Sequence, residues 1–196
     1  MEKAKAFISI GHYPKRPGAV NTKYNLVEHQ EARKIVDALF TKAIPPQTLF
    51  NYVPVNCLTL KEKAQFINQE AGDDSVAIEI HFNAWKPNQA QGIETLYFPG
   101  SKQGKILAEC LQKALLDCLP LPDRGLKERA DLYFLKAIVI PFIIAEVLFI
   151  DNDQEASYLF YPRSHLLIAK AIFKGIEGHI ERYYDQRKQE GDGLEG

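Results

Sequence analysis

The sequence of 196 residues is poor in cysteine and has no long apolar run. Cys57, Cys110 and Cys118 are an odd number without CxxC spacing. This pattern excludes a disulfide framework and a zinc ribbon, so we expect small apolar residues at these positions. The most extended apolar stretch, 137–147, is interrupted by a proline and a glutamate and is shorter than the roughly 20 residues of a membrane span. The sequence therefore predicts no membrane insertion.

The chain also lacks an excess of charge of either sign. It has 24 Lys and Arg against 25 Asp and Glu, for a formal net charge of −1. Without a basic face, the chain has no bulk attraction for nucleic acid or for an anionic membrane surface. We therefore expect no nucleic-acid partner and a compact site for a specific substrate.

Strand-like and helix-like patterns alternate along the chain, which is typical of an α/β layered sheet. With 46% hydrophobic residues, the chain is long enough for one domain with one core. We expect that domain over residues 1–185 and a flexible polar tail over 186–196. The predicted strands are 6–11, 48–55, 76–80, 92–98, 132–135 and 142–149, and the predicted helices are 28–40, 59–70, 104–119 and most of 158–184.

Two histidines occupy equivalent positions, each directly after a short apolar run that is typical of a buried strand. His12 follows the first run and His81 follows the run 76–80. Ligands of open α/β sheets bind outside the carboxyl ends of the strands, so the pair indicates a shared metal site. The alternative is that each histidine is a polar strand end satisfied by a nearby loop.

Glu146 interrupts the apolar strand 142–149. An unpaired buried carboxylate costs several kcal/mol, so Glu146 needs a partner or a place at the sheet edge. An apolar pocket raises the pKa of a glutamate and makes it a general base near neutral pH. The alternative is a structural ion pair with an arginine such as Arg124 or Arg129.

A catalytic zinc ion usually has three protein ligands and an open fourth position. Glu28 and Glu31, on either side of His29 near the start of the first predicted helix, are the candidates for the third ligand. We favour Glu28, which lies at the helix start and is free to point back toward the His12 loop. The alternative is that a glutamate there only complements the helix dipole.

Four sequence blocks follow one another in the order found in a known enzyme family, across nearly the whole chain. They are Gly11-His12 with Pro17-Gly18-Ala19, then Glu28, then 80–84 (IHFNA) with 92–95 (GIET), and finally 141–152 with Glu146. With these blocks the chain resembles the zinc-dependent N-acetylmuramoyl-L-alanine amidases (amidase type 3). That family cleaves peptidoglycan between the muramic acid lactyl group and the first L-alanine of the stem peptide. A weaker likeness covers 123–127, before 132–135.

The resemblance implies a single-domain three-layer sandwich of the phosphorylase/hydrolase-like kind, with a mostly parallel twisted sheet and helices on both faces. It implies Zn²⁺ as cofactor, with His12, Glu28 and His81 as the metal ligands. Glu146 would be the catalytic residue, taking a proton from the attacking water and returning it to the leaving amine. The implied substrate is peptidoglycan, and we expect a monomer. Action on the cell wall requires export or lysis, although residues 1–5 run into a strand too early for a secretory signal.

Three positions depart from the family's pattern. Leu148 stands where a glycine is usual, and it either narrows the pocket or repacks the core. Glu79 replaces a serine, and it either orients the His81 ring or points to the opposite face. Lys63 replaces an arginine, and it is not an equivalent fork donor. None of the three removes an expected metal ligand.

Two other functions remain open at this point. One is a different zinc hydrolase on a similar scaffold, such as a carboxypeptidase-like enzyme or an N-acyl amino acid amidohydrolase. The other is a non-catalytic peptidoglycan-binding relative, which only Leu148 and Glu79 suggest. The peptide specificity and the biological occasion of cleavage are not encoded in any motif of the chain.

Overall fold

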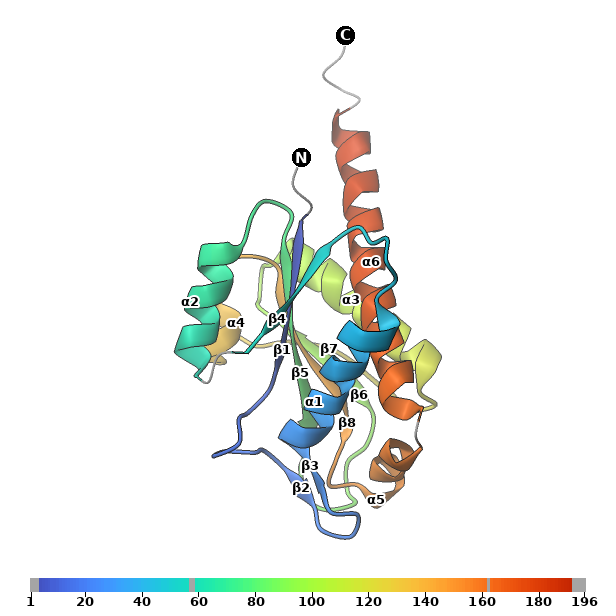
Figure 1. Ribbon diagram of the computed structural model, residues 1–196. Coiled ribbons are helices and arrows are strands. Elements are labelled where there is room, and N and C mark those ends of the chain that lie inside the picture. The colour runs from blue at the N-terminus through green and yellow to red at the C-terminus, as the bar shows by residue number, and fades with distance from the viewer. Residues whose placement is uncertain (1–3, 57–58, 162, 192–196) are drawn as a thin grey trace.

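A six-stranded sheet forms the centre of the computed structural model, which describes residues 4–56, 59–161 and 163–191 (Figure 1). Across the sheet the strand order is β4-β1-β5-β8-β6-β7. The strands are β1 (Lys5–Ile10), β4 (Asn51–Val55), β5 (Val76–Asn83), β6 (Ile93–Tyr97), β7 (Asp123–Glu128) and β8 (Phe142–Phe149).

Four neighbouring strands, β4, β1, β5 and β8, run parallel to one another. β6 is antiparallel to β8, and β7 is parallel to β6. The inner strands β1, β5 and β8 are buried along almost their whole length, as expected where helices cover both faces of a parallel sheet. The prediction of a mostly parallel sheet is confirmed.

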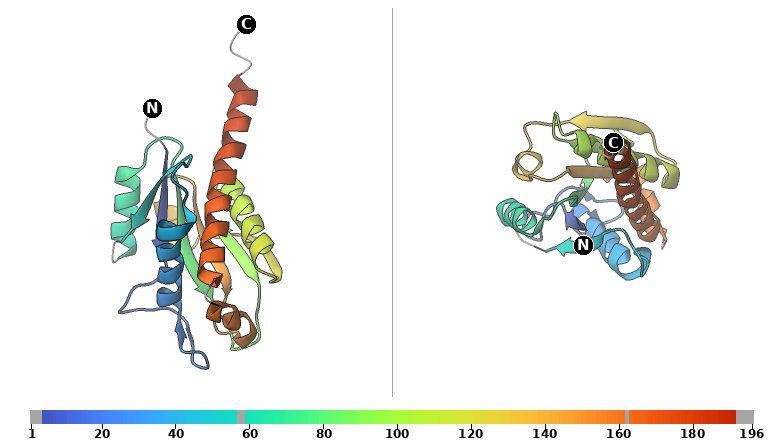
Figure 2. Two further views of the ribbon diagram at one scale, coloured as in Figure 1. Left: turned by 45° about the vertical axis from the view of Figure 1, so that its right-hand side comes forward. Right: turned by 90° about the horizontal axis from the view of Figure 1, so that it is seen from above.

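Helices cover both faces of this sheet, so the three-layer arrangement is also confirmed (Figures 1 and 2). α2 and α4 pack on one face, where Phe7 and Ala77 point toward them. α1, α3 and α6 pack on the other face, against Ile8 and Ile78. The helices are α1 (Glu28–Ala38), α2 (Leu60–Glu70), α3 (Lys102–Cys118), α4 (Tyr133–Ala137), α5 (Asp153–Ala156) and α6 (Ser164–Gly191).

Short-range signals explain where the first two helices begin. α2 starts with a capping box, in which the Glu62 amide donates to the Thr59 hydroxyl and the Thr59 amide donates to the Glu62 carboxylate. α1 follows a small antiparallel ladder of β2 (Val20–Asn21) and β3 (Leu26–Val27). This ladder returns the chain to the end of the sheet that the His12 loop has just left.

Two local predictions were wrong, and one strand was not predicted. Residues 132–135 were predicted as a strand but belong mainly to the short helix α4. The prediction failed because a short apolar run does not distinguish a buried helix from a strand. The strand β7, at 123–128, was not predicted, since its side chains are only partly buried and carry little apolar pattern. His81 lies inside β5 and not after it.

The last helix, α6, extends into the region predicted as a tail. α6 continues through Gly191, and the residues 186–190 are Gln, Arg, Lys, Gln and Glu, which are good helix formers. α6 extends past the end of the sheet at which β1 begins (Figure 1). Residues 192–196 of the predicted tail lie outside the described residues, as does Cys57. Within the described part of the chain, no helix is long and apolar enough to cross a membrane.

Two glycines of α6 give a matched test of its packing on α3. A Cβ atom at Gly175 would lie 2.8 Å from the Cα atom of Leu111, whereas a Cβ atom at Gly178 would meet nothing within 4 Å. Gly175→Ala should therefore destabilise the protein by about 1–3 kcal/mol through overpacking. Gly178→Ala should stabilise it by up to about 1 kcal/mol through helix propensity. Urea unfolding of both variants checks the prediction, and equal effects at the two positions would contradict it.

Candidate metal centre

A row of three polar side chains crosses the sheet near the carboxyl end of β5. His81 of β5 is in register with Glu146 of β8, which is in register with Glu94 of β6. Directly paired residues of neighbouring strands share a face, and adjacent strands lie about 4.8 Å apart. The three side chains therefore lie next to one another on the face that also carries Ala77, beyond the part that α2 and α4 cover.

His12 joins this row from the end of β1. The Gly11 amide donates to the Ile80 carbonyl at 2.8 Å, which continues the pairing of β1 with β5 by one residue. The backbone of His12 then takes a left-handed conformation with φ 61°, which is strained for a residue with a side chain and which turns its ring toward His81. The two ring centres lie 5.1 Å apart.

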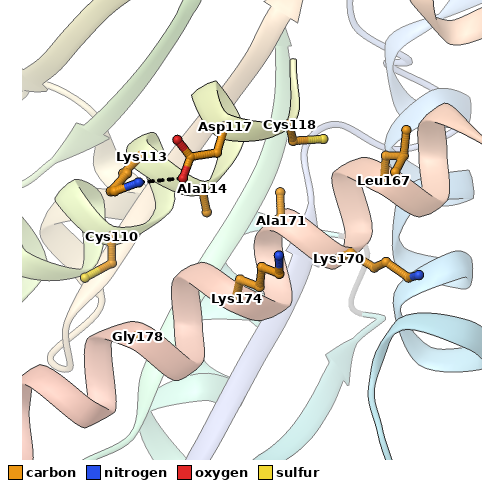
Figure 3. A pocket seen from close by; sticks show the side chains of 10 residues that line it. All are labelled: Cys110, Lys113, Ala114, Asp117, Cys118, Leu167, Lys170, Ala171, Lys174 and Gly178. Carbon is orange, nitrogen blue, oxygen red and sulfur yellow. Dashed lines mark hydrogen bonds and ion pairs between the residues drawn. The ribbon is translucent and has the colours of Figure 1, made fainter. Parts of the chain in front are cut away.

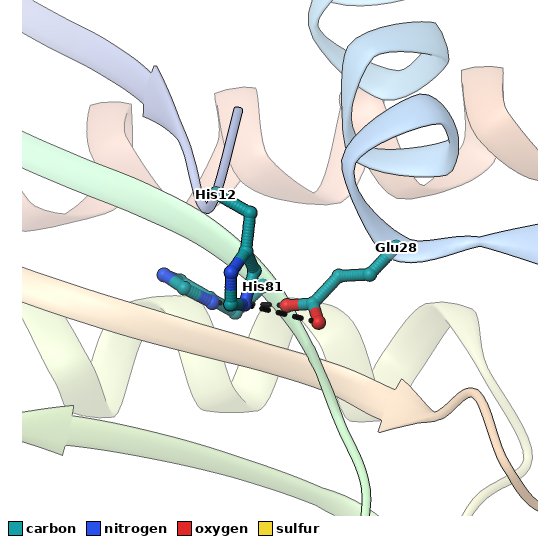
Figure 4. Close-up of side chains that lie close together, drawn as sticks. All are labelled: His12, Glu28 and His81. Atoms are coloured by element: carbon teal, nitrogen blue, oxygen red, sulfur yellow. Dashed lines mark hydrogen bonds and ion pairs between the residues drawn. The ribbon is translucent and has the colours of Figure 1, made fainter. Parts of the chain in front are cut away.

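Glu28 faces both histidines from the first turn of α1 (Figure 4). Its Oε2 lies 3.1 Å from His12 Nε2, and its Oε1 lies 3.0 Å from His81 Nδ1. The carboxylate also accepts hydrogen bonds from the backbone amides of Ala19 at 2.9 Å and Phe82 at 3.1 Å. Four donors from three chain segments thus hold one buried carboxylate in place.

The donor set and the spacing of these three residues fit a metal ion. One ligand atom from each of His12, Glu28 and His81 lies within 4.8 Å of the others. Two imidazoles and one carboxylate are a ligand set of catalytic zinc sites. Two glycines allow the approach, since a Cβ at Gly11 would meet His81 Cε1 and a Cβ at Gly18 would meet Glu28 Oε2, both well inside contact distance. These residues could therefore hold a metal ion.

Glu31, the other candidate for the third ligand, lies elsewhere. Its carboxylate contacts Lys34 Nζ at 2.7 Å and Nε2 of His165 in α6, also at 2.7 Å. The structure therefore brings Glu28, and not Glu31, to the two histidines.

The electrostatics of the three residues reflect this contact. Burial opposes the charge of Glu28, but hydrogen bonds from His12 and His81 outweigh it and lower the pKa of Glu28 to about 2. Burial also opposes protonation of His81, yet the carboxylates of Glu28 and Glu79 raise its pKa well above the ordinary value. A carboxylate that stays ionised near neutral pH is the form that binds metal.

Glu146 has the opposite environment. Burial is the main cause that raises its pKa to about 7, and the charges of Glu28 and Glu94 add to it. Its Oε2 is buried without a hydrogen-bond partner among the described residues. The alternative of an arginine ion pair is not what the structure shows, because Arg124 pairs with Glu94 and Arg129 pairs with Asp131. Glu146 is therefore an uncommitted carboxyl group next to the histidines.

Sequence reasoning assigned no role to Glu94 and Asn83, although both lie in blocks of the family pattern. Glu94 accepts hydrogen bonds from Asn83 Nδ2 and Arg124 Nε, both at 2.8 Å. Glu94 lies beside Glu146 because the two residues are paired in the register of β6 against β8. The alternation of strand faces in the sequence does not by itself specify this pairing. Asn83, Glu94 and Arg124 line a cleft of about 580 Å³. The other residues of its wall are Ala84, Trp85, Gln89, Ala90, Gln91 and Phe149.

The structure also locates the departures from the family's pattern. Leu148 is fully buried within the main hydrophobic cluster, so it repacks the core and does not line the cleft. Glu79 accepts from Lys63 Nζ at 2.5 Å and contacts His81 Nε2 at 3.1 Å. Glu79 thus points to the His81 ring and not to the opposite face.

A second groove, of about 510 Å³, lies between α3 and α6 (Figure 3). Cys110 and Cys118 contribute to its wall, and both are free thiols whose pKa is raised by burial. None of the predicted site residues lines this groove. This groove is therefore separate from the candidate metal centre.

Comparisons with known proteins identify the family to which the chain is similar. The family model for N-acetylmuramoyl-L-alanine amidase matches residues 7–178. An uncharacterized cell wall amidase of Bacillus anthracis is 32% identical over 131 residues, which are 63% of this chain and 24% of that protein. The germination-specific N-acetylmuramoyl-L-alanine amidase of Bacillus subtilis is 26% identical over 117 residues, 60% of this chain and 48% of that protein. The chain thus spans less than half the length of either relative.

A solved structure extends the likeness to the whole fold. The crystal structure of an N-acetylmuramoyl-L-alanine amidase from Clostridium difficile 630 superposes with a TM-score of 0.81 at 26% identity. The match covers 94% of this chain and 98% of that one. The family model includes the loop of His12, the start of α1 and the strands that carry His81 and Glu146, so this chain belongs to the N-acetylmuramoyl-L-alanine amidase family.

Proposed function

We propose that this chain is a zinc-dependent hydrolase that cleaves the amide bond between N-acetylmuramic acid and L-alanine in peptidoglycan. The observation that carries the proposal is the convergence of two imidazoles and one carboxylate beside a second carboxyl group with a raised pKa. Its membership of the amidase family supports the choice of substrate. It would act on the cell wall, outside the cytoplasmic membrane.

His12, Glu28 and His81 would hold the zinc ion. Bound zinc would supply Lewis-acid polarisation of the scissile carbonyl and activation of a water molecule. The backbone amides of Ala19 and Phe82 each donate to one oxygen of the Glu28 carboxylate, and they hold these oxygens toward the histidines before a metal ion binds. All three ligands come from one chain, and on this ground we propose that the catalytic unit is a monomer.

Glu146 would act as the general base and then as the general acid. Its Oε2 has no competing hydrogen-bond partner among the described residues, so it is free to accept a proton from the attacking water. The same group would return the proton to the amine nitrogen of the L-alanine residue as the amide bond breaks. Without a bound metal ion, burial and the nearby carboxylates raise the pKa of Glu146 to about 7, toward the neutral range in which a general base works.

The cleft beside Glu94 would bind the substrate. Glu94, which is in register with Glu146, lines the cleft together with other polar side chains and Trp85, which is 71% exposed. The Arg124 guanidinium lies 4.9 Å from the centre of the Phe149 ring and is held by Glu94. An exposed indole and polar groups around a cleft suit a glycan or peptide ligand better than a lipid.

Digestion of purified sacculi tests reaction and metal together. We expect release of stem peptides that begin with L-alanine, and we expect a chelator to abolish it.

Glu146→Gln should keep zinc but lose about 10²–10⁴-fold in turnover, because the general base is gone. His81→Ala should lose the metal as well. Product analysis by mass spectrometry and zinc content per chain are the measurements. Cleavage of small acyl amino acids but not sacculi would favour a different zinc hydrolase, and no turnover with no zinc would favour a binding relative.

The choice of Glu28 as third ligand has its own test. Glu28→Gln removes the charge that faces both histidines, so zinc content should fall strongly. Glu31→Gln changes an equally buried glutamate in the same helix and should leave zinc content unchanged. Atomic absorption on freshly purified variants decides between them, and the reverse result would make Glu31 the ligand.

Glu146 also predicts a pH dependence of stability in the metal-free protein. Its folded pKa of about 7 lies above the ordinary 4.5, so folding disfavours its ionisation. The contribution of Glu146 to stability therefore falls as the pH rises from about 4.5 to about 7. Glu146→Gln should be more stable than the parent at pH 8 by up to about 3 kcal/mol and equally stable at pH 4. Urea unfolding at both pH values measures this, and a difference that is the same at both would show that burial does not penalise the carboxylate.

A further inference from the structure

A buried chain of contacts leads from α2 to the far side of the His81 ring. Lys63 Nζ lies 2.5 Å from Glu79 Oε1, and Glu79 Oε2 lies 3.1 Å from His81 Nε2. The side chains of Lys63 and Glu79 are 3% and 2% exposed. The His81 ring therefore lies between two carboxylates, with Glu28 at Nδ1 and Glu79 at Nε2.

The buried ion pair has little value as a source of stability alone. Taking two charges out of water costs several kcal/mol per ion, and a pair of apolar side chains often serves stability as well or better. A pair that contacts nothing but itself would be a packing device. Here, however, one oxygen of Glu79 is committed to Lys63 and the other to the imidazole of a candidate metal ligand.

The geometry decides which ring nitrogen faces the metal site. An imidazole that donates its Nε2–H to Glu79 keeps the lone pair of Nδ1 for a metal ion, on the side of Glu28 and His12. The ring lies against the backbone at Gly11, since a Cβ there would overlap the His81 ring atoms. The ring is thus confined by backbone on one side and by Glu79 at its end.

Lys63 also reaches the strand that leads to the other histidine. Its ammonium donates to the carbonyl of Ile10 at 2.5 Å, two residues before His12. Ser9 Oγ lies 3.5 Å from Glu79 Oε1, so β1 contacts the same carboxylate. One ammonium group therefore connects the ends of β1 and β5, which carry His12 and His81.

We propose that Glu79, held by Lys63, is a positioning residue that fixes His81 with Nδ1 as its metal-binding atom. The inference rests on the metal site of the proposed function and adds residues that the family's pattern does not supply. That pattern has serine and arginine where this chain has Glu79 and Lys63. The two departures lie 16 positions apart in sequence, yet they form one contact, so they act as a single replacement of the group behind His81.

The first test compares zinc affinity in two matched variants. In Glu79→Gln a single carbonyl oxygen has to serve both Lys63 and His81, so we expect zinc affinity to fall by about 10–100-fold. Glu31→Gln is the control, because Glu31 is also a buried glutamate bonded to a lysine and to a histidine Nε2. It should lose stability without losing zinc affinity. Competition with a chelator of known affinity gives the dissociation constant, and thermal unfolding without metal checks folding.

The second test needs no variant. In the zinc-loaded parent protein, long-range ¹H–¹⁵N spectra of the histidine rings should show His81 protonated at Nε2 and metal-bound at Nδ1. Metal at Nε2 would overturn the inference even if Glu79→Gln does not fold. Equal zinc affinity of Glu79→Gln and the parent would overturn it while leaving the proposed function intact. A parent protein that binds no zinc would overturn both.

Discussion

The carboxylate of Glu28 is the interaction on which the site depends. It accepts hydrogen bonds from the backbone at Ala19 and Phe82 and faces His12 and His81 with separate oxygens. It thereby joins the loop after β1, the start of α1 and the end of β5. Burial of an unpaired carboxylate would be costly, so these partners are needed for the fold as much as for the site. The loss of any one of them leaves the buried charge less well compensated.

The row of His81, Glu146 and Glu94 imposes a second constraint. Three ionisable groups lie side by side on one face, and only Glu94 has an arginine partner. The carboxylates of Glu28 and Glu94 both raise the pKa of Glu146. The binding of a charged ligand at the site would therefore change the pKa of Glu146. A cation held by the histidines would act on Glu146 in the opposite direction to the two carboxylates. The nearby carboxylates make Glu146 costly to ionise, and the resulting rise in its pKa makes it a better general base near neutral pH.

Much of this arrangement could be predicted from the sequence, because its signals are local. Apolar runs and turn residues predicted β1, β5 and β8. His12 and His81 were recognised as the polar residues that follow the first two runs, and Glu146 as the charged residue within the third. The position of Glu28 at a helix start, together with the family resemblance, favoured it over Glu31. Contacts between distant segments could not be predicted in this way. The choice between Glu28 and Glu31 depends on His165, which lies more than 100 residues further along the chain and occupies Glu31.

Strand register was the other missing quantity. Glu94 was visible in a motif, but its place beside Glu146 follows from an antiparallel pairing of β6 with β8 that no local pattern specifies. β7 was missed for a related reason, since an edge strand with partly exposed side chains has a weak alternation signal. The prediction of a strand at α4 is wrong because five residues are too few for a helical or a strand period to show.

The departures from the family's pattern illustrate why such differences have to be interpreted in three dimensions. Taken one at a time, Lys63 is a poorer donor than arginine, and Glu79 is a charge in an apolar strand. In the structure the two residues compensate each other's buried charge, because the Lys63 ammonium pairs with the Glu79 carboxylate and both are shielded from water. Leu148 differs from them, because it is an apolar side chain that is fully buried within the main hydrophobic cluster. A substitution that adds a buried charge requires a partner nearby, and Glu79, whose partner is Lys63, also contacts the candidate metal ligand His81. It follows that Glu79 affects the orientation of His81 whether or not its pairing with Lys63 adds to the stability of the fold.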